Sequence, residues 1–106
     1  MYVNIRRYKI APGSFGELKQ QVQEGFVPIV SKLPGFVEYF WVSSGENQAL
    51  AINIFKDRAG AEESVRKAAD FIRTHKALAS LLPNPPEVIT GEVGVHQSKS
   101  ASERAA

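Results

Sequence analysis

The sequence contains no cysteine, one methionine and one tryptophan in 106 residues. The absence of cysteine excludes disulfide bonds, thiolate metal ligands and a cysteine nucleophile. No apolar stretch approaches the ~20 residues of a membrane-spanning helix, so we expect no membrane partner. The first ten residues alternate in polarity instead of forming the apolar run of a signal peptide. We therefore expect a cytoplasmic location.

The sequence also has little excess of either positive or negative charge. Thirteen Lys and Arg residues oppose eleven Asp and Glu residues, for a net charge of +2. The basic residues alternate with acidic ones along the expected helices instead of clustering, so we expect no nucleic-acid partner. The two histidines, His75 and His96, lie far apart without an acidic cluster, and we expect no metal. No glycine-rich phosphate loop occurs, so we expect no nucleotide or other cofactor.

The chain does contain a succession of strand and helix patterns. Alternating or β-branched stretches predict strands over residues 2–10, 36–43, 48–55 and 87–95. Apolar residues at helical spacing predict one helix after Pro12-Gly13 and a second after Asp57, which can act as its N-cap. Ser14-Phe15-Gly16-Glu17 fits a capping box for the first helix, and Pro28 predicts a kink near Phe26.

This order of elements, β-α-β-β-α-β, predicts an α+β domain of ferredoxin-like topology with a four-stranded antiparallel sheet. We place the domain at residues 1–96. Residues 97–106 contain no apolar side chain larger than alanine, and such a composition cannot bury enough surface to order itself. We therefore expect a disordered C-terminal tail over 97–106.

Strand parity divides the expected sheet into two faces of different chemistry. One set is aliphatic or phenylalanine: Val3, Ile5, Phe36, Phe40, Val42, Leu50, Ile52, Ile54, Ile89, Val93 and Val95. The other mixes aromatic, small and polar residues: Tyr2, Asn4, Arg6, Tyr8, Val37, Tyr39, Trp41, Ala49, Ala51, Asn53, Phe55, Val88, Thr90, Glu92 and His96. We expect helices over the aliphatic set. An exposed aromatic face usually marks an interface or a ligand site, so we expect a homodimer that covers the second set.

Several polar and aromatic residues of this second face are candidates for a site. Asn53 lies between two isoleucines in a strand that we expect to be central, where a buried amide requires partners. Arg6 could hold an oxyanion or form an ion pair with Glu92 of the last strand. Trp41 and Tyr39 fit either packing or ligand binding. His75 ends the second helix, where a cation is favoured, so it fits capping or catalysis.

Two junctions, together with the element order, resemble the antibiotic biosynthesis monooxygenase-like proteins, a group of the dimeric α/β barrel superfamily. They are Leu33-Pro34-Gly35-Phe36, which opens the second strand, and Phe55-Lys56-Asp57, which leads into a helix with Ala61-Glu62. The resemblance runs from Tyr2 to His96 and implies a dimeric α/β barrel. The oxygenases of that family attack electron-rich aromatic molecules without metal or flavin, through Asn, Trp, Tyr and Arg side chains.

The resemblance therefore implies a cofactor-independent monooxygenase that acts on a small aromatic or polyketide-like molecule. The catalytic candidates are Asn53, Arg6 and His75, and the substrate-binding candidates are Asn4, Tyr39, Trp41 and Phe55. The haem-degrading branch is not expected, because Arg6 and Val65 stand near the positions of its asparagine and tryptophan and only His75 fits. The alternative is a non-catalytic dimeric barrel that binds a small ligand or acts as a scaffold.

Overall fold

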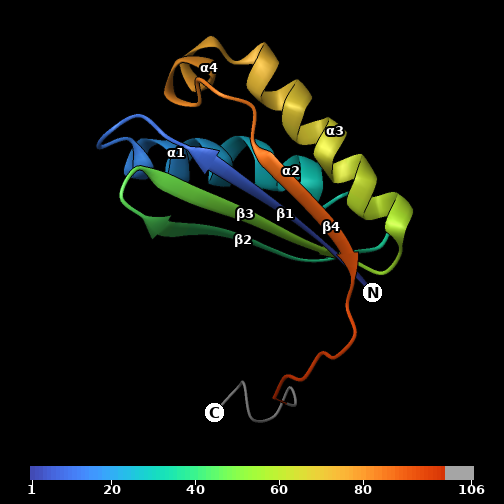
Figure 1. The fold of residues 1–106 in the computed structure, drawn as a ribbon. Helices are drawn as coiled ribbons and strands as arrows, with labels where there is room; N and C mark the ends of the chain where they lie inside the picture. Colours follow the sequence, from blue (N-terminus) through green and yellow to red (C-terminus); the bar gives the residue numbers. More distant parts are fainter. Residues whose placement is uncertain (100–106) are drawn as a thin grey trace.

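The computed structural model describes residues 1–99, which form a four-stranded sheet with helices packed on one face (Figure 1). The elements are β1 (Tyr2–Lys9), α1 (Phe15–Gln21), the π-helical segment η1 (Val22–Phe26), α2 (Val27–Val30), β2 (Phe36–Gly45), β3 (Gln48–Phe55), α3 (Arg58–Thr74), α4 (Lys76–Leu81) and β4 (Glu87–Glu92). The strand order is β2-β3-β1-β4, and every neighbouring pair is antiparallel. The predicted α+β ferredoxin-like topology is confirmed.

The first helix begins differently from the prediction. Ser14 occupies the N-cap, but its Oγ donates to the Ala11 carbonyl at 2.6 Å and makes no capping bond. The predicted capping box is wrong because Ser14 has near-helical backbone angles (φ −91°, ψ −2°), whereas a capping residue is usually extended. Near Phe26 the helix widens into η1 and resumes as α2. Pro28 lies in the first turn of α2, where the missing N–H of proline breaks no hydrogen bond within that helix.

The N-terminus of α3 follows the prediction. Asp57 is extended, and its Oδ1 accepts a hydrogen bond from the Gly60 amide at 2.9 Å. Gly60 allows the helix to approach the sheet closely, because a Cβ at this position would lie 2.5 Å from the Phe55 ring and 3.0 Å from the Pro34 carbonyl oxygen. This close approach brings the side chains of α3 onto β1 and β3.

The two faces of the sheet are the reverse of our expectation. Helices cover the mixed set, whose buried members are Asn4, Arg6, Tyr8, Ala49, Ala51, Asn53 and Phe55. The aliphatic set lies mainly on the uncovered face, where Phe40 is 45% and Ile89 is 55% exposed. The reason is complementary size: the alanines of β3 leave room for large helical side chains such as Phe26 and Phe71.

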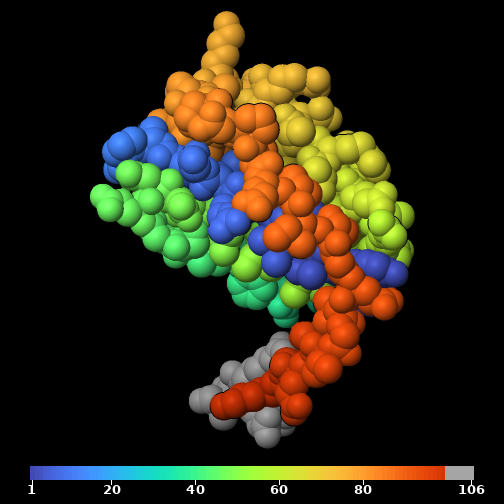
Figure 2. All heavy atoms as spheres, in the orientation of Figure 1, coloured from blue at the N-terminus to red at the C-terminus, as the bar shows by residue number. Residues whose placement is uncertain are grey.

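Beyond β4 the chain leaves the body of the domain, and Val95 is 90% exposed (Figure 2). Of the tail predicted over 97–106, only residues 97–99 are described, and they are exposed. Residues 100–106 lie outside the described residues. Among the helices of residues 1–99, none is both long enough and apolar enough to cross a membrane.

Candidate functional site

A row of polar side chains crosses the helix-covered face of the sheet. The strand register places Thr90, Asn4, Asn53 and Tyr39 next to one another on β4, β1, β3 and β2. Asn4 and Asn53 are both 0% exposed. The polar interruption of an apolar strand had made Asn53 a candidate, and the family resemblance had added Asn4 and Tyr39. The register adds Thr90, which was not a candidate.

Arg6 lies one row further along β1 and is 2% exposed. Its Nη1 donates to Asn4 Oδ1 at 2.6 Å, and its Nε donates to the Tyr8 hydroxyl at 3.0 Å. Asn4 Nδ2 in turn donates to Thr90 Oγ1 at 2.9 Å. These bonds join β1 and β4 into one network and fix the direction of the guanidinium. Tyr8 was missed as a site residue, although its parity with Arg6 could have identified it.

The partners of Arg6 are all neutral. Within residues 1–99 the ion pairs involve Arg7, Arg58, Arg66 and Arg73, and none involves Arg6. The ion pair considered between Arg6 and Glu92 does not form, because Glu92 is exposed at the end of β4. No hydrogen bond of the described residues uses Arg6 Nη2. A buried cation without a counter-ion is costly, so this position favours a negatively charged ligand.

Arg6 lines a cavity between the sheet and the helices. The cavity has a volume of about 20 Å³, which is room for one water molecule. Its walls are formed by Tyr8, Val22, Phe26, Tyr39, Trp41, Ala51, Ala68, Phe71, Ile72, Leu78 and Leu82. The Arg6 Cζ lies 5.8 Å from the Phe26 ring centroid, which is a cation–π contact. The arrangement is a cation set among aromatic rings.

Tyr39 supplies a hydroxyl on the β2 side of the cavity. Its ring meets Phe26 edge to face, with centroids 5.7 Å apart. Burial raises the pKa of Tyr39 far above its usual value, and the positive charge of Arg6 opposes this shift only in part. Tyr39 is therefore a neutral phenol at physiological pH, able to donate a hydrogen bond.

Two side chains on the helix-covered face of the sheet hold buried polar atoms without partners among the described residues. They are Asn53, at both Nδ2 and Oδ1, and Trp41, at Nε1. Buried polar atoms are nearly always hydrogen-bonded, and an unmade bond costs about 1–3 kcal/mol. These groups are therefore available to a bound water or ligand.

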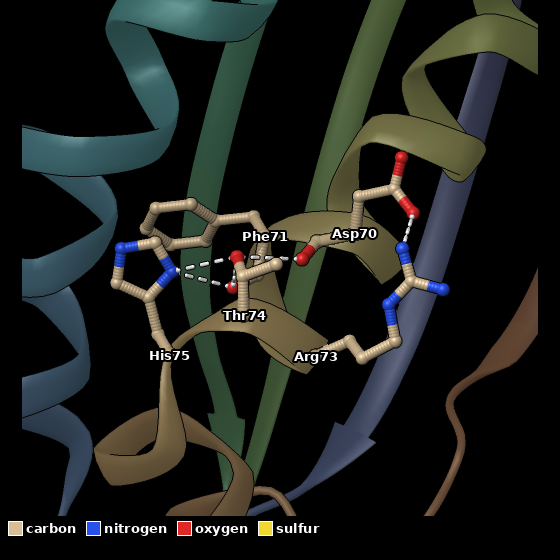
Figure 3. Close-up of polar contacts among 5 residues, drawn as sticks. All are labelled: Asp70, Phe71, Arg73, Thr74 and His75. Atoms are coloured by element: carbon tan, nitrogen blue, oxygen red, sulfur yellow. Dashed lines mark hydrogen bonds and ion pairs between the residues drawn. The ribbon is translucent and has the colours of Figure 1, made fainter.

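Four sequence candidates lie outside the cavity lining: the cross-strand neighbours Asn4 and Asn53, and also His75 and Phe55. His75 is exposed between α3 and α4; its ring centroid is 4.3 Å from that of Phe71, and its Nδ1 is 2.7 Å from the Phe71 carbonyl oxygen (Figure 3). Since a carbonyl oxygen only accepts, Nδ1 is the donor, which is a capping role. Phe55 is fully buried, and its ring meets Phe36 at 5.8 Å. Phe71 lines the cavity and separates His75 from it, whereas Phe36, the neighbour of Phe55, is not part of the lining.

Histidine and acidic side chains do not gather in this region. Anywhere in residues 1–99, no three His, Cys, Asp or Glu side chains lie close enough to hold a metal ion. The functional groups of this region are consequently one buried guanidinium, two amides, a neutral phenol and an indole. Such groups bind and orient an anionic aromatic molecule and donate hydrogen bonds to developing negative charge.

No family model matches the chain, and no curated protein is detectably similar in sequence. Solved structures do match it. A Nitrosomonas europaea protein of unknown function is 20% identical, with a TM-score of 0.73 over 94% of this chain and 95% of that chain. A Streptomyces coelicolor monooxygenase, solved with nanaomycin D, is 16% identical, with a TM-score of 0.70 over 93% of this chain and 92% of that chain.

A third match is a Bordetella bronchiseptica structure named for the antibiotic biosynthesis monooxygenases. It is 16% identical, with a TM-score of 0.71 over 89% of this chain and 97% of that chain. At such identities the likeness concerns the fold, and fold alone does not decide function. The fold of this chain is the one found in antibiotic biosynthesis monooxygenase structures, as the sequence resemblance predicted.

Proposed function

We propose that the protein binds a small phenolic aromatic molecule at Arg6 and oxidises it with O₂, without a metal or an organic cofactor. The observation that carries this proposal is the buried Arg6 guanidinium, which has only neutral partners in residues 1–99. An ionised phenol would supply the missing negative charge. The aromatic rings of the cavity would stack on its flat surface. The fold shared with a monooxygenase structure supports the oxidative part of the proposal.

The proposed reaction is balanced without an external reductant. A phenol with a free para C–H position plus O₂ gives a para-quinone plus water. One oxygen atom becomes the new carbonyl and the other becomes water, and all four electrons that reduce O₂ come from the phenol. Arg6 would lower the pKa of the bound phenol, because a nearby cation favours the anion. The phenolate is more electron-rich than the phenol and transfers electrons to O₂ more readily.

The remaining polar groups would act on the oxygen side of the reaction. The Asn53 amide has no partner in the described residues and follows Ala51 of the cavity lining on the same face of β3. In the widened cavity it would donate to the negative charge that develops on the reduced oxygen. Tyr39 stays protonated because of its raised pKa, and it would supply a second hydrogen bond. Asn4 would hold Arg6 in place through its 2.6 Å bond. Trp41 would form an aromatic wall.

A non-catalytic barrel that binds a small ligand or acts as a scaffold is the second candidate, and the small size of the cavity favours the scaffold. A volume of about 20 Å³ does not hold an aromatic ring. Binding of an aromatic ligand, with or without catalysis, therefore requires the cavity to widen. The π-helical segment η1 supplies two of its walls, Val22 and Phe26. Such segments are frequent at functional sites, and we infer that η1 moves when a ligand enters.

Replacement of Arg6 tests the proposal. We expect wild-type protein to bind 1-naphthol in calorimetric titrations, and Arg6→Gln to weaken this binding about tenfold to a hundredfold, the value of a charge-assisted hydrogen bond. Arg6→Lys keeps the charge and should retain part of the affinity. Arg7→Gln is the matched control, because Arg7 is exposed and pairs with Glu87. Equal affinity in Arg6→Gln and wild type, with both proteins folded by circular dichroism, contradicts the proposal.

An oxygen electrode separates the two candidate functions. The monooxygenase predicts that one O₂ is consumed for each quinone formed, without added metal or flavin. Binding of the phenol without oxygen consumption supports the non-catalytic candidate instead. Since His75 is exposed and its Nδ1 is bonded to the Phe71 carbonyl oxygen, His75→Ala should leave the rate within about twofold of wild type, which tests its remaining candidacy as a catalytic residue.

We also propose that the protein is a homodimer, formed through the aliphatic face instead of the aromatic one. Large apolar side chains of this face are exposed or half-buried in the monomer, among them Phe40, Ile52 and Ile89. Covering 600 Å² of such surface is worth on the order of 15 kcal/mol at about 25 cal/mol per Å², before the costs of association. A second copy of the chain would cover this face, as in the dimeric α/β barrel that the family resemblance implies. The cytoplasmic location stays a prediction.

A further inference from the structure

A second hollow lies against the cavity wall. It is an open groove of about 380 Å³ between the α1–η1 helix and the edge strand β2. The groove and the cavity share three side chains: Val22, Tyr39 and Trp41. These side chains therefore form the partition between the two spaces. A molecule that displaces part of this partition would occupy the cavity and the groove together.

The groove has one aromatic wall and one charge. Phe15 of α1 stacks on Trp41 of β2, with ring centroids 6.2 Å apart and an interplanar angle of 11°. Lys19 follows Phe15 by one helical turn, so its side chain lies on the same side of α1. Lys19 is exposed, takes part in no ion pair of the described residues, and shares the groove with no acidic side chain.

Trp41 links this groove to the buried polar groups. It lines both spaces. Its Nε1 is buried and has no hydrogen-bond partner in residues 1–99. A ligand oxygen at the partition would satisfy this donor. The groove therefore offers a flat ring surface, an unmade hydrogen bond and a solvated cation, in addition to the buried cation of the cavity.

We propose that the groove is an outer subsite for a carboxylate, and that the natural ligand is a phenol carrying a short acidic side chain. This inference rests on the proposed function, because the phenolic ring is placed at Arg6. Arg6 takes the phenolate end, and Lys19 takes the carboxylate end. Two cations of different burial select a molecule with two negative groups separated by an aromatic body. Lys19 is then a specificity-determining residue.

A pair of probes that differ only in charge tests the subsite. We would titrate 3-(4-hydroxynaphthalen-1-yl)propanoic acid and its methyl ester by calorimetry. Wild type should bind the acid roughly threefold to fivefold more tightly than the ester, the range of an exposed ion pair. Lys19→Gln should abolish this preference, and Lys19→Arg should restore it. The preference should also shrink at 0.5 M salt, because exposed charges are screened.

The control variant is Lys32→Gln, which removes the same charge from an exposed position near the end of α2 that does not line the groove. It should keep the preference for the acid. Equal affinity for acid and ester in wild type overturns the subsite, as does a preference that survives Lys19→Gln or is lost equally in Lys32→Gln. Failure of the ester to bind wild type overturns the proposed function as well. Binding of the acid that depends on Arg6 but not on Lys19 overturns the subsite alone.

Discussion

At the scale of residues, the buried polar side chains of this domain differ in whether they have hydrogen-bond partners. Asn4 is bonded to Arg6 and to Thr90, at 2.6 and 2.9 Å. Asn53, its direct cross-strand neighbour, has no partner in the described residues. The two amides have the same chemistry and the same burial, and they differ only in their neighbours. This contrast makes them a matched pair for mutation.

We predict that Asn4→Leu lowers the free energy of unfolding by about 1.5–3 kcal/mol, because it removes a hydrogen bond to a buried charge. Asn53→Leu should cost less than half as much, because no protein hydrogen bond is broken and the unsatisfied amide is removed. Urea unfolding followed by circular dichroism measures both values. An Asn53→Leu variant as unstable as Asn4→Leu would show that Asn53 has an essential partner, such as an ordered water.

Both amides could be identified as candidates from the sequence, Asn53 because it interrupts an apolar strand and Asn4 through the family resemblance. Their partners could not be identified. The bond from Arg6 to Asn4 joins residues two apart, but the bond from Asn4 to Thr90 joins residues 86 apart. Only the antiparallel pairing of β1 with β4 brings Thr90 opposite Asn4. The sequence therefore indicates a polar site, and the strand register determines which of its side chains are hydrogen-bonded to one another.

At the scale of elements, the first helix is interrupted where it faces the cavity. η1 contains Gly25, which lies against Phe71 of α3: a Cβ at this position would be 2.6 Å from the Phe71 Cζ. Phe71 is only 7% exposed and also lines the cavity. The wide turn and the missing side chain together let the two helices approach each other above Arg6. The sequence predicted an irregularity here from Pro28, but not its π-helical form.

We predict that Gly25→Ala lowers the free energy of unfolding by about 1–3 kcal/mol, because the added methyl group overpacks the contact with Phe71. Gly16→Ala in α1 is the matched control. A Cβ at Gly16 meets nothing within 4 Å, so the substitution should be neutral or stabilising by up to about 1 kcal/mol. Thermal unfolding of both variants measures the difference. Equal melting temperatures for Gly25→Ala and Gly16→Ala would contradict the close contact.

At the scale of the whole molecule, the helices leave one face of the sheet without cover. Exposed or half-buried apolar side chains on this face belong to all four strands. Exposed apolar surface of this extent usually marks an association site. The proposed dimer would bury it and leave the Arg6 cavity on the opposite side of the sheet. Each copy would then hold its own cavity.

We predict that wild type elutes as a dimer at micromolar concentration in size-exclusion chromatography with light scattering. Phe40→Lys should shift it to a monomer, because a charge at the centre of an apolar interface is left without a partner. Ile29→Lys in α2 is the control, since Ile29 is comparably exposed, at 38% against 45% for Phe40, but lies in the helical layer. A monomeric wild type would contradict the dimer.

The sequence alone determined the order of the elements, the cap at Asp57 and the division of the sheet into two chemically distinct faces. These features depend on neighbours within a few residues, and local periodicity and capping chemistry report them. The tertiary structure decided which face the helices cover. That choice depends on how large helical side chains such as Phe26 and Phe71 fit over Ala49 and Ala51, a match of volumes between segments distant in sequence. It therefore also decided that Arg6 is buried in a cavity instead of at an interface.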